Sequence, residues 1–271
     1  VKGSHIVVRR LYDDPRCFFF QNADGRIFFS IPYQGDFTLI GTTDQDFDGD
    51  PASVDISPAE IDYLLEAANQ YFSDPIDKDD IVWTYSGVRP LYNDGASKAQ
   101  EATRDYVLKH TGGKGTPALL NVFGGKLTTY RRLAESALEH IESALGRRKP
   151  RWTAHSFLPG GGFAVDGFEA EVEGLRAQYP FLAARDAERL TRAYGTLARA
   201  ILGDARTPKD LGPDFGCGLT GAEVRHLVEH EWARSAQDIL WRRSKLGLYG
   251  ERIDGPALAA FVRDMVDAPN P

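Results

Sequence analysis

The first third of the chain consists of short runs in which aromatic and β-branched residues alternate with polar ones. This pattern predicts β-strands at residues 6–8, 17–21, 26–31 and 37–43. The segment Asn22-Ala23-Asp24-Gly25 separates the second run from the third and is typical of a hairpin turn. The N-terminal third is therefore predicted to be rich in β-sheet.

A helix is predicted to begin directly after Ser57. Ser57 suits the N-cap position, Pro58 suits the first turn, and Glu60 completes a capping box. Apolar residues then recur at helical spacing over 61–72. The next predicted elements are strands at 80–91 and 102–108, a loop at 112–115, a short buried strand at 119–123 and a helix at 128–145.

Strand patterns disappear after Pro150, and the chain becomes helical from Gly167 onward. Helices are predicted at 168–179, 184–193, 197–202 and 223–241, and a domain boundary is predicted near 150–165, around the glycine-rich segment 158–162. The fold class is therefore expected to be α+β. It comprises a β-rich region over 1–116, a strand–loop–helix region over 117–157 and an all-α region over 158–271.

Length, charge and cysteine content exclude several classes of protein. A chain of 271 residues fits one large or two modest domains, and no apolar run approaches the ~18 residues of a membrane-spanning helix. The net charge of −7 argues against a general nucleic-acid or anionic-lipid surface. Cys17 and Cys217 show no spacing pattern, which excludes a disulfide scaffold or a zinc site and fits a reducing compartment.

Two local patterns imitate ligand-binding motifs. Residues 216–221 match the dinucleotide glycine fingerprint, but no hydrophobic strand precedes them, and Thr220 with Glu223 is better interpreted as a helix capping box. Residues 44–49 resemble the start of a calcium loop, yet Asp55 stands where the bidentate Glu belongs. A polar turn is therefore the better interpretation, and no metal site is predicted.

The segment from Gly124 to Thr129 is a stronger candidate for chemistry. It places paired glycines, Lys126 and two hydroxyl side chains between a strand and a helix. Glycines permit close approach of a ligand to the backbone, and free N–H groups at a helix start favour electron-rich ligand atoms. An ordinary strand–turn–helix connection explains the spacing equally well, so both interpretations stay open.

Three further side chains are candidates. Arg89 lies between apolar neighbours just before Pro90, where burial without an anion would be costly. Arg104 lies in a second extended context, and His5 lies among strand residues. Most arginines are simply solvated, and a lone histidine is more often structural than catalytic.

A set of motifs extends over nearly the whole chain. The motifs are Gly3-Ser4-His5, residues 40–44 with 49–51, residues 82–91, residues 103–106, residues 124–131, residues 158–161, residues 227–231 and residues 238–247. Together they resemble the FAD-dependent, membrane-associated glycerol-3-phosphate dehydrogenases. The family's N-terminal Rossmann segment is missing, the chain begins Val1-Lys2 and its only methionine is Met265, so we expect a C-terminal portion of such an enzyme.

The resemblance implies a reaction and roles for the candidates. Family members oxidise sn-glycerol 3-phosphate to dihydroxyacetone phosphate, with hydride passing to FAD and electrons to a membrane quinone. Residues 1–116 would then be a substrate-binding region and 117–157 would complete the FAD domain. The catalytic set implied is His5, Arg89, Arg104 and Lys126, and the cofactor-binding set is Gly124, Gly125, Lys126, Leu127, Thr128 and Thr129.

Within the catalytic set, His5 is a plausible base for the substrate hydroxyl. The resemblance does not fix which arginine binds the phosphate; Arg104 on the phosphate and Arg89 at the reacting end is one assignment, and the reverse stays open. The implied location is cytoplasmic, with peripheral contact to the inner face of the cell membrane, no nucleic acid, and a homodimer left open. Two alternatives remain: a glycerol-3-phosphate oxidase that uses oxygen, and a non-catalytic binding module.

Overall fold

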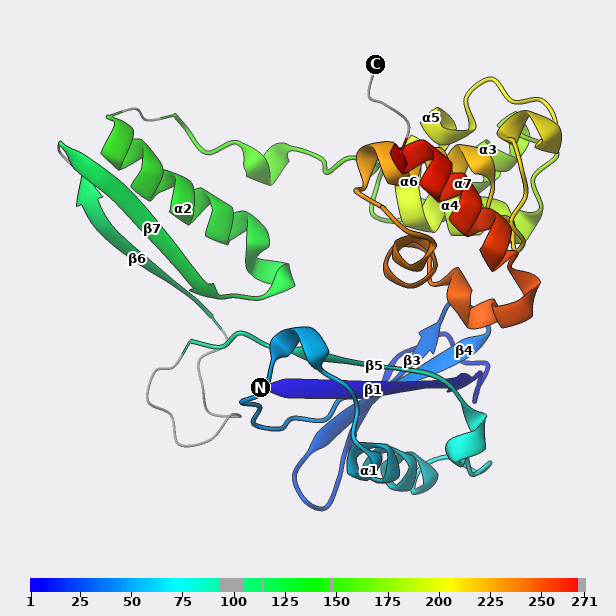
Figure 1. Cartoon of the computed structure of the whole chain (residues 1–271), viewed down its shortest axis with the longest axis horizontal. Helices are drawn as coiled ribbons and strands as arrows, with labels where there is room; N and C mark the ends of the chain where they lie inside the picture. Colours follow the sequence, from blue (N-terminus) through cyan, green and yellow to red (C-terminus); the bar gives the residue numbers. More distant parts are fainter. Residues whose placement is uncertain (93–104, 114, 147–148, 268–271) are drawn as a thin grey trace. The chain divides into compact units, whose positions relative to one another are not determined.

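The chain consists of a mixed α/β unit followed by a helical one. The computed structural model describes residues 1–92, 105–113, 115–146 and 149–267. It divides into two compact units, Val1–Ala154 and His155–Pro271. Within the described residues all strands belong to the first unit and the second unit is helical (Figure 1). The predicted α+β class is confirmed, whereas the division into three functional regions stays a prediction.

An antiparallel sheet of five strands forms the centre of the first unit. The strand order is β2-β3-β4-β1-β5, and neighbouring strands run antiparallel. The predicted strands of the N-terminal third are confirmed. Their bounds are β1 Lys2–Arg9, β2 Phe18–Gln21, β3 Ile27–Tyr33, β4 Phe37–Gly41 and β5 Ile81–Val88.

Helix α1 (Pro58–Asn69) covers one face of this sheet. Both hydrogen bonds of the predicted capping box between Ser57 and Glu60 are present. The apolar core beneath the helix comprises Ile6, Val8, Phe28, Ile40, Leu64, Leu65, Ala67, Ala68 and Ile76. Because successive residues of a strand point to opposite faces, Gly3, His5 and Val7 of β1 lie on the face away from α1. That face carries the candidate site.

A β-hairpin and a helix complete the first unit. Strands β6 (Tyr106–Gly113) and β7 (Thr116–Gly124) pair antiparallel, and α2 (Tyr130–Leu145) packs against both (Figure 1). The strand predicted over 102–108 continues to Gly113, and its residues 102–104 lie outside the described residues.

The prediction of a short buried strand at 119–123 is wrong in two respects. Strand β7 is nine residues long, and Leu119 and Val122 are 58% and 48% exposed. The apolar run indicated burial, but the hairpin leaves these side chains uncovered in this chain.

The second unit is built from helices around its own apolar core. The predicted single helix over 223–241 is wrong, because α6 ends at His230 and Trp232 adopts a left-handed backbone with φ 57°. A separate π-helix follows, and α7 was not predicted. The elements are α3 Phe168–Gln178, α4 Ala184–Tyr194, α5 Ala198–Leu202, α6 Gly221–His230, the π-helix η7 Asp238–Arg243 and α7 Gly255–Asp267.

Short 3-10 turns connect the larger elements of both units. They are η1 Pro51–Ser53, η2 Lys78–Asp80, η3 Leu127–Thr129, η4 Thr153–His155, η5 Gly195–Leu197, η6 Pro208–Leu211 and η8 Leu246–Arg252.

Each of the two glycine-rich segments of the second unit includes a glycine that packs closely against the protein. Thr196 donates its N–H to the Gly160 carbonyl at 3.0 Å, so the segment 158–162 is held within the unit. In the 216–221 segment, a Cβ on Gly216 would meet the Arg252 carbonyl, and Thr220 caps α6. Glu223 does not complete the predicted capping box, because its carboxylate instead accepts from Arg189 and Tyr194.

Candidate active site

His5 lies in the middle of the sheet face that α1 leaves uncovered. The register places it opposite Gly41 of β4 on one side and Tyr85 of β5 on the other. Its imidazole stacks on the Tyr85 ring with centroids 4.7 Å apart and an interplanar angle of 7°. A Cβ on Gly41 would collide with the imidazole. The absence of a side chain at Gly41 therefore leaves the space in which the His5 ring lies.

The surroundings keep His5 neutral. Burial, reinforced by the positive charge of Arg89, lowers the pKa of His5 to about 4. Burial also raises the pKa of Tyr33 to about 12, with a contribution from Tyr85. The Nδ1 atom of His5 is buried and has no hydrogen-bond partner among the residues that the structure describes. At neutral pH His5 is thus an uncharged imidazole.

Arg89 follows the end of β5 and is fixed through its backbone and its side chain. Its N–H donates to the Val1 carbonyl at 2.7 Å. Its guanidinium pairs with the Asp44 carboxylate and donates to Thr42 Oγ1 at 3.1 Å. A Cβ on Gly3 would lie only 2.6 Å from one guanidinium nitrogen, so the guanidinium occupies space that a glycine provides. Arg89 is thereby placed close enough to His5 to affect its pKa.

The Gly124–Thr129 loop connects β7 to α2. Gly124 and Gly125 adopt positive φ angles of 67° and 101°, which favour glycine. A Cβ on Gly124 would lie 3.5 Å from the Pro90 carbonyl, so this end of the loop lies beside the residue that follows Arg89. Lys126, Leu127 and Thr128 are exposed, and the backbone N–H of Lys126 donates to Thr129 Oγ1 at 3.2 Å. This loop is therefore an exposed junction between a strand and a helix.

The structure brings some of the predicted residues together. His5 and Arg89 lie on one sheet face, and the loop from Gly124 to Thr129 begins next to Pro90. Arg104 lies outside the described residues.

Sequence analysis missed the supporting roles of Gly41, Asp44 and Tyr85. The sequence indicates a polar turn at Asp44, and it includes Gly41 and Tyr85 only within the family motifs 40–44 and 82–91, without a role for either. Strand register, which the sequence did not predict, is what places both beside the site.

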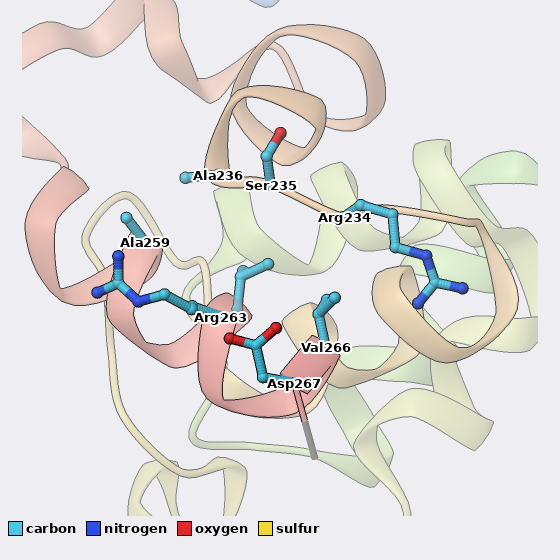
Figure 2. Close-up of a pocket in the computed structure, with 8 residues that line it drawn as sticks. Arg234, Ser235, Ala236, Ala259, Arg263, Val266 and Asp267 are labelled. Carbon is cyan, nitrogen blue, oxygen red and sulfur yellow. The ribbon is translucent and has the colours of Figure 1, made fainter. Parts of the chain in front are cut away.

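A separate hollow lies in the second unit between α7 and the segment before η7 (Figure 2). Its volume is about 280 Å³, and its lining includes the apolar residues Ala236, Val262 and Val266 and the exposed residues Arg234 and Arg263. No predicted site residue lines it. The sheet face therefore remains the candidate site.

Two family models match the chain. Residues 1–131 match the model described as FAD dependent oxidoreductase. Residues 151–267 match the model described as the C-terminal domain of alpha-glycerophosphate oxidase. The two matched segments correspond to the sheet-containing unit and the helical unit.

Curated relatives and a solved structure agree with these matches. The chain is 48% identical over 250 residues to the aerobic glycerol-3-phosphate dehydrogenase of Escherichia coli (strain K12), covering 92% of this chain and 50% of that protein. It is 41% identical over 247 residues to the D-erythritol 1-phosphate dehydrogenase of Brucella abortus (strain 2308), covering 90% and 49%. The chain spans about half the length of the curated relatives it matches.

The solved structure is that of a glycerol-3-phosphate dehydrogenase from Bacillus halodurans complexed with FAD. It superposes with a TM-score of 0.73 at 28% identity, covering 92% of this chain and 48% of that one. The similarity therefore extends through both units of the fold.

Proposed function

The chain belongs to the family of FAD-dependent glycerol-3-phosphate dehydrogenases, and we propose that it forms the substrate-binding part of such an enzyme. The reaction proposed is oxidation of sn-glycerol 3-phosphate to dihydroxyacetone phosphate. The observation that carries this proposal is a neutral, half-buried imidazole near a guanidinium on one sheet face, at His5 and Arg89. Oxidation of an alcohol needs a proton acceptor, and a nearby cation favours the alkoxide that forms.

His5 is proposed as the group that accepts the proton of the C2 hydroxyl. A general base must be unprotonated at the working pH and lie within hydrogen-bond reach of the proton it takes. The lowered pKa of His5 meets the first condition. Its buried Nδ1 atom has no hydrogen-bond partner among the described residues, so no protein group there competes for the proton. Tyr85 and Gly41 orient the ring by stacking against it and by leaving space for it.

Cations are proposed to bind the phosphate and steady the reacting oxygen. A phosphate monoester carries two negative charges near neutral pH, and a guanidinium can bind it through two parallel hydrogen bonds. We assign Arg104 to the phosphate, Arg89 to the reacting end and Lys126 to substrate oxygens at the loop. The ion pair with Asp44 holds Arg89 in place before substrate arrives.

The loop from Gly124 to Thr129 is proposed to contact FAD. The left-handed glycines and the exposed residues Lys126, Leu127 and Thr128 leave this loop open to the close approach of a ligand. Bound FAD would supply the acceptor for the hydride that leaves C2. The protein residues bind the substrate, hold its C2–H in position and take up the proton.

The uncovered apolar side chains of the hairpin and α2 support a role within a larger protein. Leu119 and Val122 of β7 and Leu138 and Leu145 of α2 are large, apolar and exposed. Clusters of such residues mark interaction surfaces. The matched relative is about twice as long as the segment that this chain covers. We propose that the part of the enzyme outside this chain covers these side chains.

Membrane quinone is the proposed final electron acceptor, with peripheral membrane contact. No helix among the described residues is long and apolar enough to cross a bilayer. The basic segment 241–246 gives this contact little support, because Arg242 pairs with Asp238 and Arg243 donates to the Glu231 carbonyl at 2.7 Å.

Molecular oxygen is the alternative acceptor, and the oxidase named in the C-terminal family model favours testing it. Release of hydrogen peroxide during turnover of the full-length enzyme would identify an oxidase. Reduction of a quinone analogue without peroxide would identify the dehydrogenase.

The proposed function is tested by replacing the cations in the full-length enzyme. Arg104→Ala and Lys126→Ala should each weaken binding of glycerol 3-phosphate by about 10- to 150-fold, since a hydrogen bond to a charged group contributes about 1.5–3 kcal/mol. Arg104→Ala should also reduce the preference for glycerol 3-phosphate over glycerol. An unchanged preference with collapsed turnover would assign Arg104 to the reacting end instead. Wild-type kinetics in both variants, and in His5→Ala, would reject the site.

A further inference from the structure

We propose that Glu60, on the opposite side of the sheet from His5, is a positioning residue for Arg89. It acts through the segment Thr42-Thr43-Asp44, which Glu60 holds on one side and which holds Arg89 on the other. The inference rests on the proposed function, because it assumes that Arg89 contacts substrate.

Glu60 is a buried carboxylate with an unusually complete set of donors. It is 1% exposed. One oxygen, Oε2, accepts from the backbone N–H and the hydroxyl of Ser57 at 2.8 and 2.9 Å and pairs with Lys2 Nζ at 2.7 Å. The other oxygen, Oε1, accepts from Ser4 Oγ at 2.8 Å and Thr43 Oγ1 at 2.7 Å. Burial acts to raise the pKa of Glu60, but these hydrogen bonds outweigh it and lower the pKa to about 2.

The two oxygens serve different purposes. The contacts of Oε2 with Ser57 complete the capping box of α1, and a partly exposed carboxylate could do the same. The contacts of Oε1 contribute nothing to the helix end. They reach across to β1 and to the segment that follows β4, at Ser4 and Thr43. A buried charge is costly unless it is paired, so this placement needs a reason beyond helix capping.

The second set of contacts fixes the segment after β4. The Thr43 hydroxyl accepts from the Ser4 N–H at 2.9 Å while it donates to Glu60. Lys2 and Gln45 exchange backbone hydrogen bonds at 2.7 and 3.0 Å. Lys2 belongs to β1. Its backbone therefore holds Gln45, the residue after the segment, and its side chain holds Glu60.

The neighbours of Thr43 hold Arg89. Thr42 Oγ1 accepts from the guanidinium at 3.1 Å, and the Asp44 carboxylate forms an ion pair with it. Thr43 is thus bonded to Glu60 while the residues before and after it are bonded to Arg89. Any shift of Thr43 would move both partners of Arg89 together. Reaction rates are sensitive to such shifts, since a displacement of a substrate-contacting group by about 1 Å can lower the rate about 100-fold.

The test uses the full-length, FAD-loaded enzyme and a double-mutant cycle with Arg89. Glu60→Gln keeps the shape of the side chain but removes the charge that Lys2 requires. Thr43→Val keeps the shape of Thr43 but removes its hydroxyl. Each should lower kcat/KM for glycerol 3-phosphate about 10- to 100-fold. In an Arg89→Ala background, each substitution should lower kcat/KM further by less than about twofold, because the group that Glu60 and Thr43 position is already gone.

Two controls separate positioning from general stability. Ser57→Ala removes the helix cap without touching Thr43, and should lower the melting temperature while leaving kcat/KM within about twofold of wild type. Thr43→Ser restores the hydroxyl and should return kcat/KM to nearly the wild-type value. If Glu60→Gln does not fold, the Thr43→Val cycle and its Ser rescue decide the question alone.

The outcomes distinguish the two proposals. If Arg89→Ala leaves kcat/KM unchanged, the proposed role of Arg89 and this inference both fail. Suppose instead that Arg89→Ala lowers kcat/KM. If Thr43→Val then lowers kcat/KM by the same factor with and without Arg89, only the positioning role of Glu60 is rejected. The same conclusion follows if Ser57→Ala lowers kcat/KM as much as Glu60→Gln does.

Discussion

The imidazole of His5 and the phenol ring of Tyr85 lie almost parallel across neighbouring strands, with centroids 4.7 Å apart and planes inclined by 7°. The two residues are direct partners in the β1–β5 register. Stacking covers one face of the imidazole with apolar surface, and burial is the larger of the two causes that lower the pKa of His5. The cross-strand pairing thus sets both the orientation of this side chain and its charge state.

Removing the Arg89 charge should raise the pKa of His5. The ordinary pKa is about 6.5 and the site lowers it to about 4, with burial first and Arg89 second among the causes. In Arg89→Gln the pKa should rise but stay below 6.5, because burial persists. Titration of His5 by NMR measures this, with Arg10→Gln as the control at an exposed arginine. An unchanged His5 titration in Arg89→Gln would show that the two side chains are not electrostatically coupled.

His5 should also make the stability of the chain depend on pH. Its folded-state pKa lies below its unfolded value, so the unfolded chain binds more protons between about pH 4 and 6.5. Stability should therefore be fully present above about pH 6.5 and decline as the pH falls toward 4. Urea midpoints at pH 7, 5.5 and 4.5 should show a smaller decline in His5→Gln than in wild type. His155→Gln, at an exposed histidine, should retain the wild-type decline.

Gly41→Ala should displace His5. The new Cβ would collide with the imidazole, and overpacking of this kind costs about 1–3 kcal/mol. We expect a lower unfolding free energy, a His5 pKa closer to its ordinary value and loss of turnover in the full-length enzyme. Gly87→Ala is the matched control in the same sheet, because nothing lies within 4 Å of its new Cβ. Equal tolerance of the two substitutions would mean that the His5 ring does not need the space over Gly41.

Features set by neighbouring residues could be predicted from the sequence. The start of α1 followed from Ser57, Pro58 and Glu60, which interact within one helical turn. The end of α6 could not be predicted in this way. The apolar spacing continues past His230, but Trp232 adopts a left-handed backbone that breaks the helix.

The candidate site depends on contacts between residues far apart in sequence. His5, Gly41 and Tyr85 meet only because β1 pairs with β4 and β5 in one particular register. A shift of one residue would turn His5 toward α1. The ion pair between Asp44 and Arg89 could not be predicted for the same reason. The exposure of β7 depends on what covers the hairpin, and the apolar residues of the strand do not indicate this.

Gly125→Ala should impair FAD retention in the full-length enzyme. Gly125 has a φ of 101°, a conformation that strains any residue with a Cβ, and it lies in the loop proposed to contact FAD. Gly146→Ala is the matched control at the other end of α2, since Gly146 also has positive φ and nothing lies near its new Cβ. Both variants should lose some stability, but only Gly125→Ala should lower the flavin content of the purified protein. A normal flavin content in Gly125→Ala would separate the loop from the cofactor.

The helical unit should fold without the rest of the chain, and removing one partner of its buried ion pair should destabilise it strongly. Its core residues all lie within His155–Pro271.

Inside this unit the Glu223 carboxylate accepts two hydrogen bonds from Arg189 at 2.7 Å and one from Tyr194 at 2.8 Å. Glu223→Gln leaves the buried guanidinium unpaired and should cost about 3–5 kcal/mol. Glu188→Gln removes an exposed ion pair with Arg192 and should cost at most about 0.5 kcal/mol. Urea unfolding of the isolated segment 155–271, followed by circular dichroism, measures both. A segment without cooperative unfolding would show that the unit depends on the rest of the chain, and similar small losses in the two variants would reject the stabilising role of the Glu223 pair.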